Sequence, residues 1–95
     1  MFEQSHANQT IAVRLLAEAL SLTPRARLAR LLLRLADDTG AVEGSQEDFA
    51  RVIGMTRSSV RRAMASLTEI GVIETGYRNH VIVDPDHLEK LTTEA

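Results

Sequence analysis

The chain of 95 residues contains no cysteine and no tryptophan, and only 3% of its residues are aromatic. Without cysteine it can form neither a disulfide nor a thiolate zinc site nor a cysteine-held iron–sulfur cluster. Its histidines, His6, His80 and His87, are scattered, and none has a partner at the spacing of metal ligands. We therefore expect surface histidines, no metal and no other cofactor.

The sequence also lacks a long apolar run. No stretch approaches the roughly 20 apolar residues of a membrane span. The N-terminus does not have the basic and then apolar pattern of a secretory signal. These absences predict a cytoplasmic protein that does not bind a membrane.

Nothing in the sequence has the pattern of a catalytic site. We find no pairing of a nucleophile with a base, no glycine-rich phosphate loop and no metal-binding set. Asp37 and Asp38 are the nearest candidate for a carboxylate pair, but adjacent acids at a helix end are more simply solvated. We do not expect an enzyme.

What the sequence does have, over residues 46–67, is the pattern of two short helices joined at Gly54. Glycine ends the first helix because it adopts the left-handed conformation without steric cost. The small Ala50 lies where the two helices would cross. The expected apolar face of the first helix consists of Phe49, Val52 and Ile53.

The second helix, about residues 56–67, is expected to have one buried and one exposed face. Thr56 can cap its first turn, as Ser45 and Asp48 can form a capping box at the start of the helix before it. The expected inward residues are Val60, Ala63, Met64 and Leu67, and the outward ones are Arg57, Ser58, Arg61 and Arg62. Arginines at the start of an exposed helix can bond guanine or grip a phosphate. Simple solvation of the helix is the alternative.

A net charge of −2 and a pI near 5.9 argue against a DNA-binding domain at first sight. The charge is unevenly distributed, however: residues 1–36 carry +3, 37–48 carry −5, 49–83 carry +3 and 84–95 carry −3. The candidate reading helix therefore lies in a basic segment. The acidic segments are most simply solvated surface.

Two helices are expected before this motif. Asn8–Leu22 has an apolar face too broad for an exposed helix of a monomer, so we expect it to pack against a partner. Thr23 caps and Pro24 opens a second helix that runs to about Ala36. Its expected apolar stripe is Leu28, Leu31, Leu32 and Leu35. Arg27, Arg30 and Arg34 lie on another face, where we expect them to pair with Asp37, Asp38 or solvent rather than with phosphates.

After the motif, β-branched residues on either side of a turn at Gly76–Asn79 predict a hairpin over residues 72–83. Asp84 and Pro85 then start a short helix that contains Leu88 and Leu91. Within the loop 37–44, Ala41 and Val42 form the only possible strand.

A hairpin directly after a recognition helix is a wing. The fold class is therefore mainly α with a small β-hairpin wing: a winged helix-turn-helix with a three-helix core, preceded by an N-terminal helix. We expect residues 1–22 to be the end of a dimerisation or linker helix, and 23–95 to be the DNA-binding domain.

The run from TPRARLARLLLRLAD through SQEDFARVIGMTRSSVRRAMASLTEIGVIETGYRNHVIVDP resembles the C-terminal winged-helix domain of Crp/Fnr-family bacterial transcription regulators over residues 23–88. In that family, positions matching Arg57 and Arg62 contact DNA. The position of a base-reading glutamate in well-known members is Ser58 here, so the family's usual half-site does not carry over. The hairpin before the motif is shortened or absent, and the N-terminal effector domain has no counterpart.

The resemblance implies sequence-specific binding of double-stranded DNA by a transcription regulator, with the recognition helix in the major groove. It implies a homodimer through the N-terminal helix on a pseudo-palindromic operator, and RNA polymerase as a further partner. The expected DNA contacts are Thr56, Arg57, Ser58, Ser59, Arg61, Arg62, Arg78 and Asn79. Tyr77 either contacts a phosphate or packs under the wing. The alternative is a winged-helix module that binds only an acidic protein.

Overall fold

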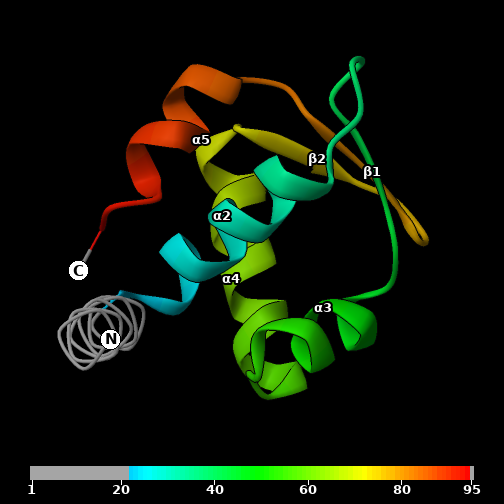
Figure 1. Cartoon of the computed structure of the whole chain (residues 1–95), viewed down its shortest axis with the longest axis vertical. Coiled ribbons are helices and arrows are strands. Elements are labelled where there is room, and N and C mark those ends of the chain that lie inside the picture. Colours follow the sequence, from blue (N-terminus) through cyan, green and yellow to red (C-terminus); the bar gives the residue numbers. More distant parts are fainter. Residues whose placement is uncertain (1–21, 95) are drawn as a thin grey trace, which may run out of the picture.

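The structure, a computed structural model, describes residues 22–94. Within them lie four helices and a small antiparallel sheet (Figure 1). The helices are α2 (Pro24–Leu35), α3 (Gln46–Ile53), α4 (Arg57–Ile70) and α5 (Pro85–Leu91), and the strands are β1 (Ala41–Glu43), β2 (Ile73–Thr75) and β3 (Asn79–Ile82). This is the predicted winged helix-turn-helix. The helix expected over Asn8–Leu22 lies outside the described residues except for Leu22, and His6 also lies outside them.

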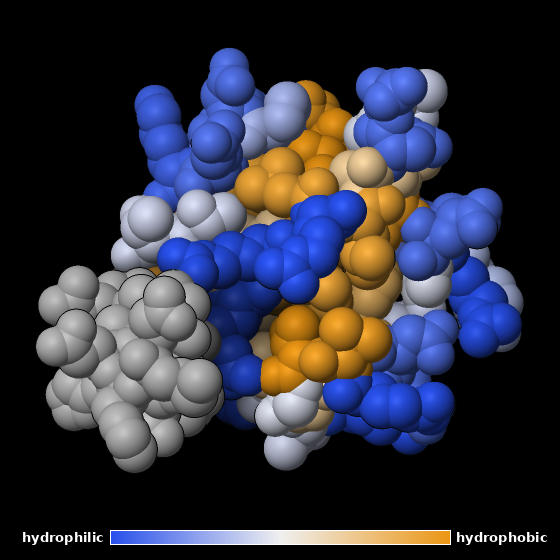
Figure 2. Space-filling view, viewed as in Figure 1, coloured by the Kyte–Doolittle hydropathy of each residue, from blue (hydrophilic) through white to orange (hydrophobic). Residues whose placement is uncertain are grey.

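Helix α2 begins as predicted. The Thr23 hydroxyl accepts a hydrogen bond from the Ala26 N–H at 3.1 Å, and Pro24 follows as the first helical residue. The buried stripe was predicted correctly except at Leu35, which is 46% exposed. Leu35 is the last residue of the helix, and Leu33 and Ala36 pack at the edge of the core instead. On the face shown in Figure 2, apolar residues form a central band that hydrophilic side chains cross and surround.

Helix α3 has the predicted capping box and the predicted end at Gly54, whose φ is 67°. Phe49 and Ala50 are buried and Ile53 is half-buried, but Val52 is 67% exposed, so its assignment to the apolar face was wrong. At about 100° per residue, the three buried or half-buried positions share an arc of about 100° that excludes Val52. Its spacing was helical, but this short helix presents only that narrow arc to the core.

Helix α4 buries the four residues predicted to face inward. It continues past residue 67, where its end was expected, to Ile70. Gly71 then ends it with a φ of 91°, and its N–H donates to the carbonyls of Leu67 and Thr68. The helix therefore keeps one more turn than predicted before the wing begins.

The sheet has the strand order β1-β3-β2, and all of its pairs are antiparallel. Strands β2 and β3 form the predicted wing. The segment before α3 supplies β1, a single strand whose Val42 pairs with His80, rather than the family's hairpin.

His80 is only 4% exposed, so the expectation of a surface histidine was wrong there. Alternation along β3 turns His80 and Ile82 inward. The His80 Nε2–H donates to the Gly44 carbonyl at 2.9 Å, and the ring lies 5.4 Å from that of Phe49. His87 is exposed, as expected.

Arg34 is exposed to solvent, which is one of the expected outcomes, but Arg27 and Arg30 bond neither Asp37 nor Asp38, which corrects the expectation for these two. Arg27 donates to the Ile53 carbonyl, and Arg30 donates to the Thr92 carbonyl at 2.8 Å. The Asp37 carboxylate instead accepts from groups of its own loop, on Thr39 and Ala41. These carbonyl partners come from distant segments, so sequence proximity misled the prediction.

Helix α5 starts at the predicted Asp84 cap, whose carboxylate accepts from the His87 N–H at 3.1 Å. Leu88 is fully buried and Leu91 packs at the edge of the core, which holds α5 against α2. None of the described helices is long and apolar enough to cross a membrane.

Candidate nucleic-acid interface

The first turns of α4 present a polar and basic face to solvent. Thr56, Arg57, Ser58, Arg61 and Arg62 are exposed, and Ser59 is half-buried. The reason is local, because the buried residues of α4 recur at helical spacing and turn these side chains outward. Arg57, Ser58, Arg61 and Arg62 thus share one exposed face of α4, whereas Thr56 and Ser59 lie at its cap.

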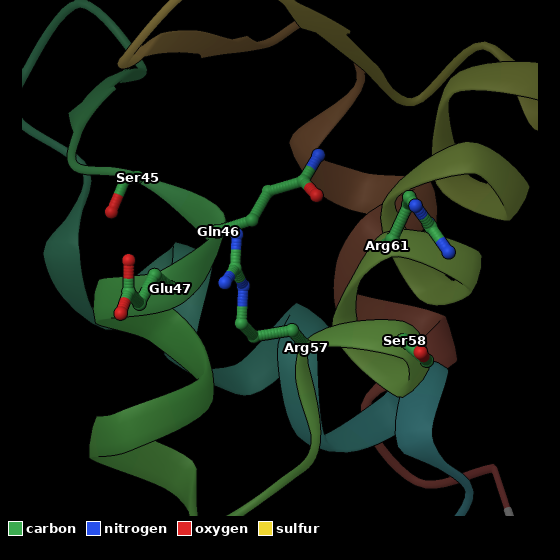
Figure 3. Close-up of a pocket in the computed structure, with 6 residues that line it drawn as sticks. All are labelled: Ser45, Gln46, Glu47, Arg57, Ser58 and Arg61. Carbon is green, nitrogen blue, oxygen red and sulfur yellow. The ribbon is translucent and has the colours of Figure 1, made fainter.

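The start of α3 lies opposite this face and encloses a hollow of about 460 Å³ with it. The lining residues are Ser45, Gln46, Glu47, Arg57, Ser58 and Arg61 (Figure 3). In the close-up, Arg57 extends from the start of α4 toward the start of α3, where Gln46 and Glu47 lie. A hollow with guanidinium, amide and hydroxyl groups on its walls can bond phosphates or the edges of bases.

Gln46 and Glu47 belong to this hollow, but sequence reasoning did not select them. Their position in the first turn of a capped helix beside the reading helix was the available signal. Glu47 Oε1 lies 3.9 Å from Arg51 Nη2 on the next turn of α3, and both side chains are exposed. This carboxylate opposes the approach of a phosphate, whereas the neutral Gln46 does not.

The wing provides the other wall of the interface. A second hollow, of about 410 Å³, is lined by Ser45, Gln46, Glu47, Gly76, Tyr77, Arg78 and His80. Tyr77 is 91% exposed, so of its two predicted positions it does not adopt the one under the wing. Arg78 has a φ of 63°, a left-handed conformation that is costly for arginine. Asn79 is exposed at the start of β3.

Two hydrogen bonds tie the wing to the entrance of α3 at Gly44. The Gly44 N–H donates to the Arg78 carbonyl at 3.0 Å, and the Gly44 carbonyl accepts from His80. A Cβ at Gly44 would stand 2.9 Å from the Phe49 ring, so the close approach requires glycine. The wing and the first turn of α3 are therefore held as one wall.

The first turns of α4 and α3 contain further hydrogen bonds, and that of α3 also contains a charged carboxylate. The Thr56 hydroxyl accepts from the Ser59 N–H at 3.1 Å and donates to the Ser59 hydroxyl at 2.9 Å, so both side chains serve the cap of α4. At α3, the Ser45 N–H and then the Ser45 hydroxyl hold the pKa of Asp48 below its usual range, with smaller contributions from Arg78 and Arg51. Asp48 thus stays ionised and partly offsets the positive wing.

No group of three His, Cys, Asp or Glu residues among residues 22–94 could hold a metal ion. The polar groups of the two hollows are arginines, hydroxyls and amides, with Glu47 and the buried His80 beside them. This donor set suits hydrogen bonding to an anionic polymer rather than metal ligation.

The family model described as the Crp-like helix-turn-helix domain matches residues 26–91. The chain belongs to the Crp-like helix-turn-helix domain family. A CRP-family transcriptional regulator from Thermus thermophilus is 31% identical, with a TM-score of 0.71, over 98% of this chain and 52% of its own. The family match and the similarity to this regulator together support a role in DNA-binding transcription regulation.

Two more distant structures have the same fold as this Crp-like helix-turn-helix domain. A CRP/FNR-family regulator from the same organism is 22% identical, with a TM-score of 0.75, over 94% of this chain and 51% of its own. The CO-sensing protein from R. rubrum is 23% identical, with a TM-score of 0.68, over 87% and 43%. The chain thus spans about half the length of these proteins. No curated protein matches it significantly.

Proposed function

We propose that this Crp-like domain binds double-stranded DNA in a sequence-specific way, with the start of α4 in the major groove and the wing on the flanking backbone. It acts there as part of a cytoplasmic transcription regulator. The observation that carries the proposal is the exposed face of α4 with Arg57, Arg61 and Arg62, faced by the start of α3 and flanked by Arg78 of the wing. A groove of a duplex supplies the acceptors for such a face.

Each residue type has a distinct role in this arrangement. Arg57 and Arg62 supply bidentate contacts to guanine or phosphate, and Arg61 a further contact. Ser58, on the wall of the hollow, offers a weaker hydrogen bond. Thr56 and Ser59 orient the first turn of α4, whose backbone N–H groups favour a phosphate.

The wing extends the contact beyond the reading helix. Arg78 and Asn79 bond phosphates, and the exposed Tyr77 adds its hydroxyl. Such contacts carry no sequence information of their own but fix the domain on the duplex. Residue 58 carries a short hydroxyl where the longer glutamate stands in well-known family members. We expect the preferred half-site to differ accordingly.

We further propose a homodimer through residues 1–22, with 23–95 as the DNA-binding part. A two-fold dimer would place two copies of α4 in successive major grooves about 34 Å apart on a pseudo-palindromic operator. RNA polymerase is the further partner that a regulator at a promoter would meet.

Selection of bound sites from random duplexes tests this proposal. We expect enriched sites with two-fold symmetry and half-sites one helical turn apart. Affinity for the selected site should fall steeply as salt is raised, because bound phosphates release counterions. A pool without enrichment, together with binding that ignores salt, would contradict DNA reading.

The acidic overall charge favours a second candidate function, a winged-helix module that binds only a protein. The net charge is −2, and the exposed arginines of α4 would then meet an acidic partner surface. This candidate predicts no salt-dependent binding to any duplex. The same selection and salt titration therefore separate the two functions.

A further inference from the structure

The C-terminal tail folds back onto the start of α2, the point where residues 1–22 join the domain. Figure 1 shows the red end of the chain beside the cyan start of α2, on the side away from the wing. The Thr23 N–H donates to the Glu94 carbonyl at 3.1 Å, and the Thr23 hydroxyl donates to Glu94 Oε1 at 3.1 Å. Residues 71 positions apart are thus joined through both backbone and side chain.

Arg25 connects this contact to the reading helix. Its Nε donates to Glu94 Oε1 at 2.9 Å and its Nη2 bonds Glu94 Oε2, while its Nη1 donates to the Ser66 hydroxyl at 3.0 Å. A forked contact of this kind fixes orientation as well as distance. We call Thr23, Arg25, Ser66 and Glu94 the tail lock.

The segments that contribute to the tail lock are each anchored in the fold. Ser66 stands on α4 between turns that bury Ala63 and Leu67 in the core. The tail is anchored by the buried Leu88 of α5 and by Arg30, which donates to the Thr92 carbonyl. The side chains of Arg25 and Glu94 are each 29% exposed, so solvent screens their attraction only in part. The direction of the chain at Thr23 is therefore fixed relative to α4.

We infer that the tail lock is a positioning device for DNA binding: it sets the angle between the reading helix and the chain that enters at Thr23. The inference rests on the proposed function, in which residues 1–22 join two domains. With the lock closed, both copies of α4 are held at the spacing of two half-sites. With it open, each domain pivots at Thr23, and the second domain meets its half-site less often.

This role separates two affinities that a purely stabilising role would change together. Loss of the lock lowers the effective concentration of the second domain at its half-site, which weakens binding to a complete site. Contacts of one domain with one half-site are unchanged, because Glu94 lies outside both hollows. Loss of stability alone would reduce the folded fraction and would weaken binding to the single half-site as well.

The test compares the full chain with its Glu94→Ala variant by fluorescence anisotropy, on the selected two-fold site and on the same duplex with one half-site scrambled. We expect Glu94→Ala to lower affinity for the complete site by roughly tenfold and to leave the half-site affinity within about twofold. Arg25→Lys, which keeps the charge but loses the fork, should fall between. Asp37→Asn, which weakens a loop at the far end of α2, is the matched control and should leave the ratio unchanged.

A loss of half-site affinity beyond twofold in Glu94→Ala, or an unchanged affinity for the complete site, would overturn the tail lock while leaving DNA binding intact. Glu94→Gln provides the same comparison if Glu94→Ala does not fold. If the unmodified chain binds neither duplex, the proposed function fails, and the lock as a positioning device fails with it.

Discussion

Three of the four arginines of α2 differ in their surroundings from the exposed arginines of α4, although their chemistry is the same. Arg25, Arg27 and Arg30 each bond a carboxylate, hydroxyl or carbonyl of another segment. Within residues 22–94, Arg57, Arg61 and Arg62 form no side-chain hydrogen bond or ion pair, and all three are exposed. One helix uses arginine to hold the fold together, and the other keeps it available. A helix with exposed arginines and no internal partners is the better candidate for an external anion.

The largest effect is expected from substitutions of the exposed arginines in α4. Arg57→Ala or Arg62→Ala should lower affinity for the selected duplex by about 1 to 3 kcal/mol and relax the preference at one base pair, because a bidentate contact is lost. The free energy of unfolding should hardly change. Anisotropy titrations over a range of salt concentrations measure the first effect, and urea denaturation measures the second.

Arg34→Ala is the control for both variants, since Arg34 is an exposed arginine of α2. It should leave the affinity close to that of the unmodified chain. An Arg57→Ala protein with unchanged affinity and salt slope would mean that α4 is not the reading helix.

The reverse pattern is expected for α2. Arg27→Met keeps the aliphatic stem but removes the donor to the Ile53 carbonyl at the end of α3. We expect a loss of about 1.5 kcal/mol in the free energy of unfolding, the usual value of a hydrogen bond to a charged group. Urea denaturation measures it, with Arg34→Met as the exposed control. Unaltered stability would mean that the Arg27 contact contributes little.

The wing tip lies between the two regions, because Arg78 combines an unfavourable backbone with an exposed charge. Arg78→Gly should raise the free energy of unfolding by about 0.5 kcal/mol as the left-handed strain is relieved. It should also weaken DNA binding and reduce the salt slope by about 1. Arg78→Lys, which keeps the charge, should retain most of the affinity without the gain in stability. A phosphate contact would be contradicted if Arg78→Lys and Arg78→Gly changed the DNA affinity and the stability in the same way.

The smallest expected effect is a loss of folding stability at acid pH. The forked bond from Arg25 lowers the pKa of Glu94 below its ordinary value of 4.5, with the Thr23 hydroxyl adding to the effect. A carboxyl with a depressed folded pKa stabilises the fold above its unfolded pKa and loses that contribution as the pH falls through the folded value. Stability should therefore decline below about pH 4.5. Thermal melts of the unmodified chain and of Glu94→Gln should converge in that range, and a constant gap would contradict the coupling.

Local signals in the sequence were sufficient for the starts of α3 and α4 and for the turn between them. The capping box at Ser45 and Asp48, the left-handed Gly54 and the Thr56 cap all formed as predicted, because each depends on residues within one turn. The exposed arginines of α4 were placed correctly for the same reason. Gln46 and Glu47 were missed, since only the approach of α3 to α4 brings them into the hollow.

Errors arose where a residue depends on a distant partner. His80 was expected at the surface but is buried, because β1 pairs with β3 and Phe49 packs against its ring. Val52 and Leu35 kept the helical spacing but extend beyond the area that neighbouring helices cover. Membership of the Crp-like family does not correct these predictions. The family's order of elements determines the helices and strands but not every packing partner.

By itself the sequence determined most of the secondary structure and which face of α4 is exposed, because caps, turns and helical periodicity act over a few residues. Only the tertiary structure decided which arginines are exposed without a partner and which bond another segment of the chain. The partners of Arg25 and Arg27 lie 69 and 26 residues away. Chain proximity in space, and not spacing along the sequence, selects such partners.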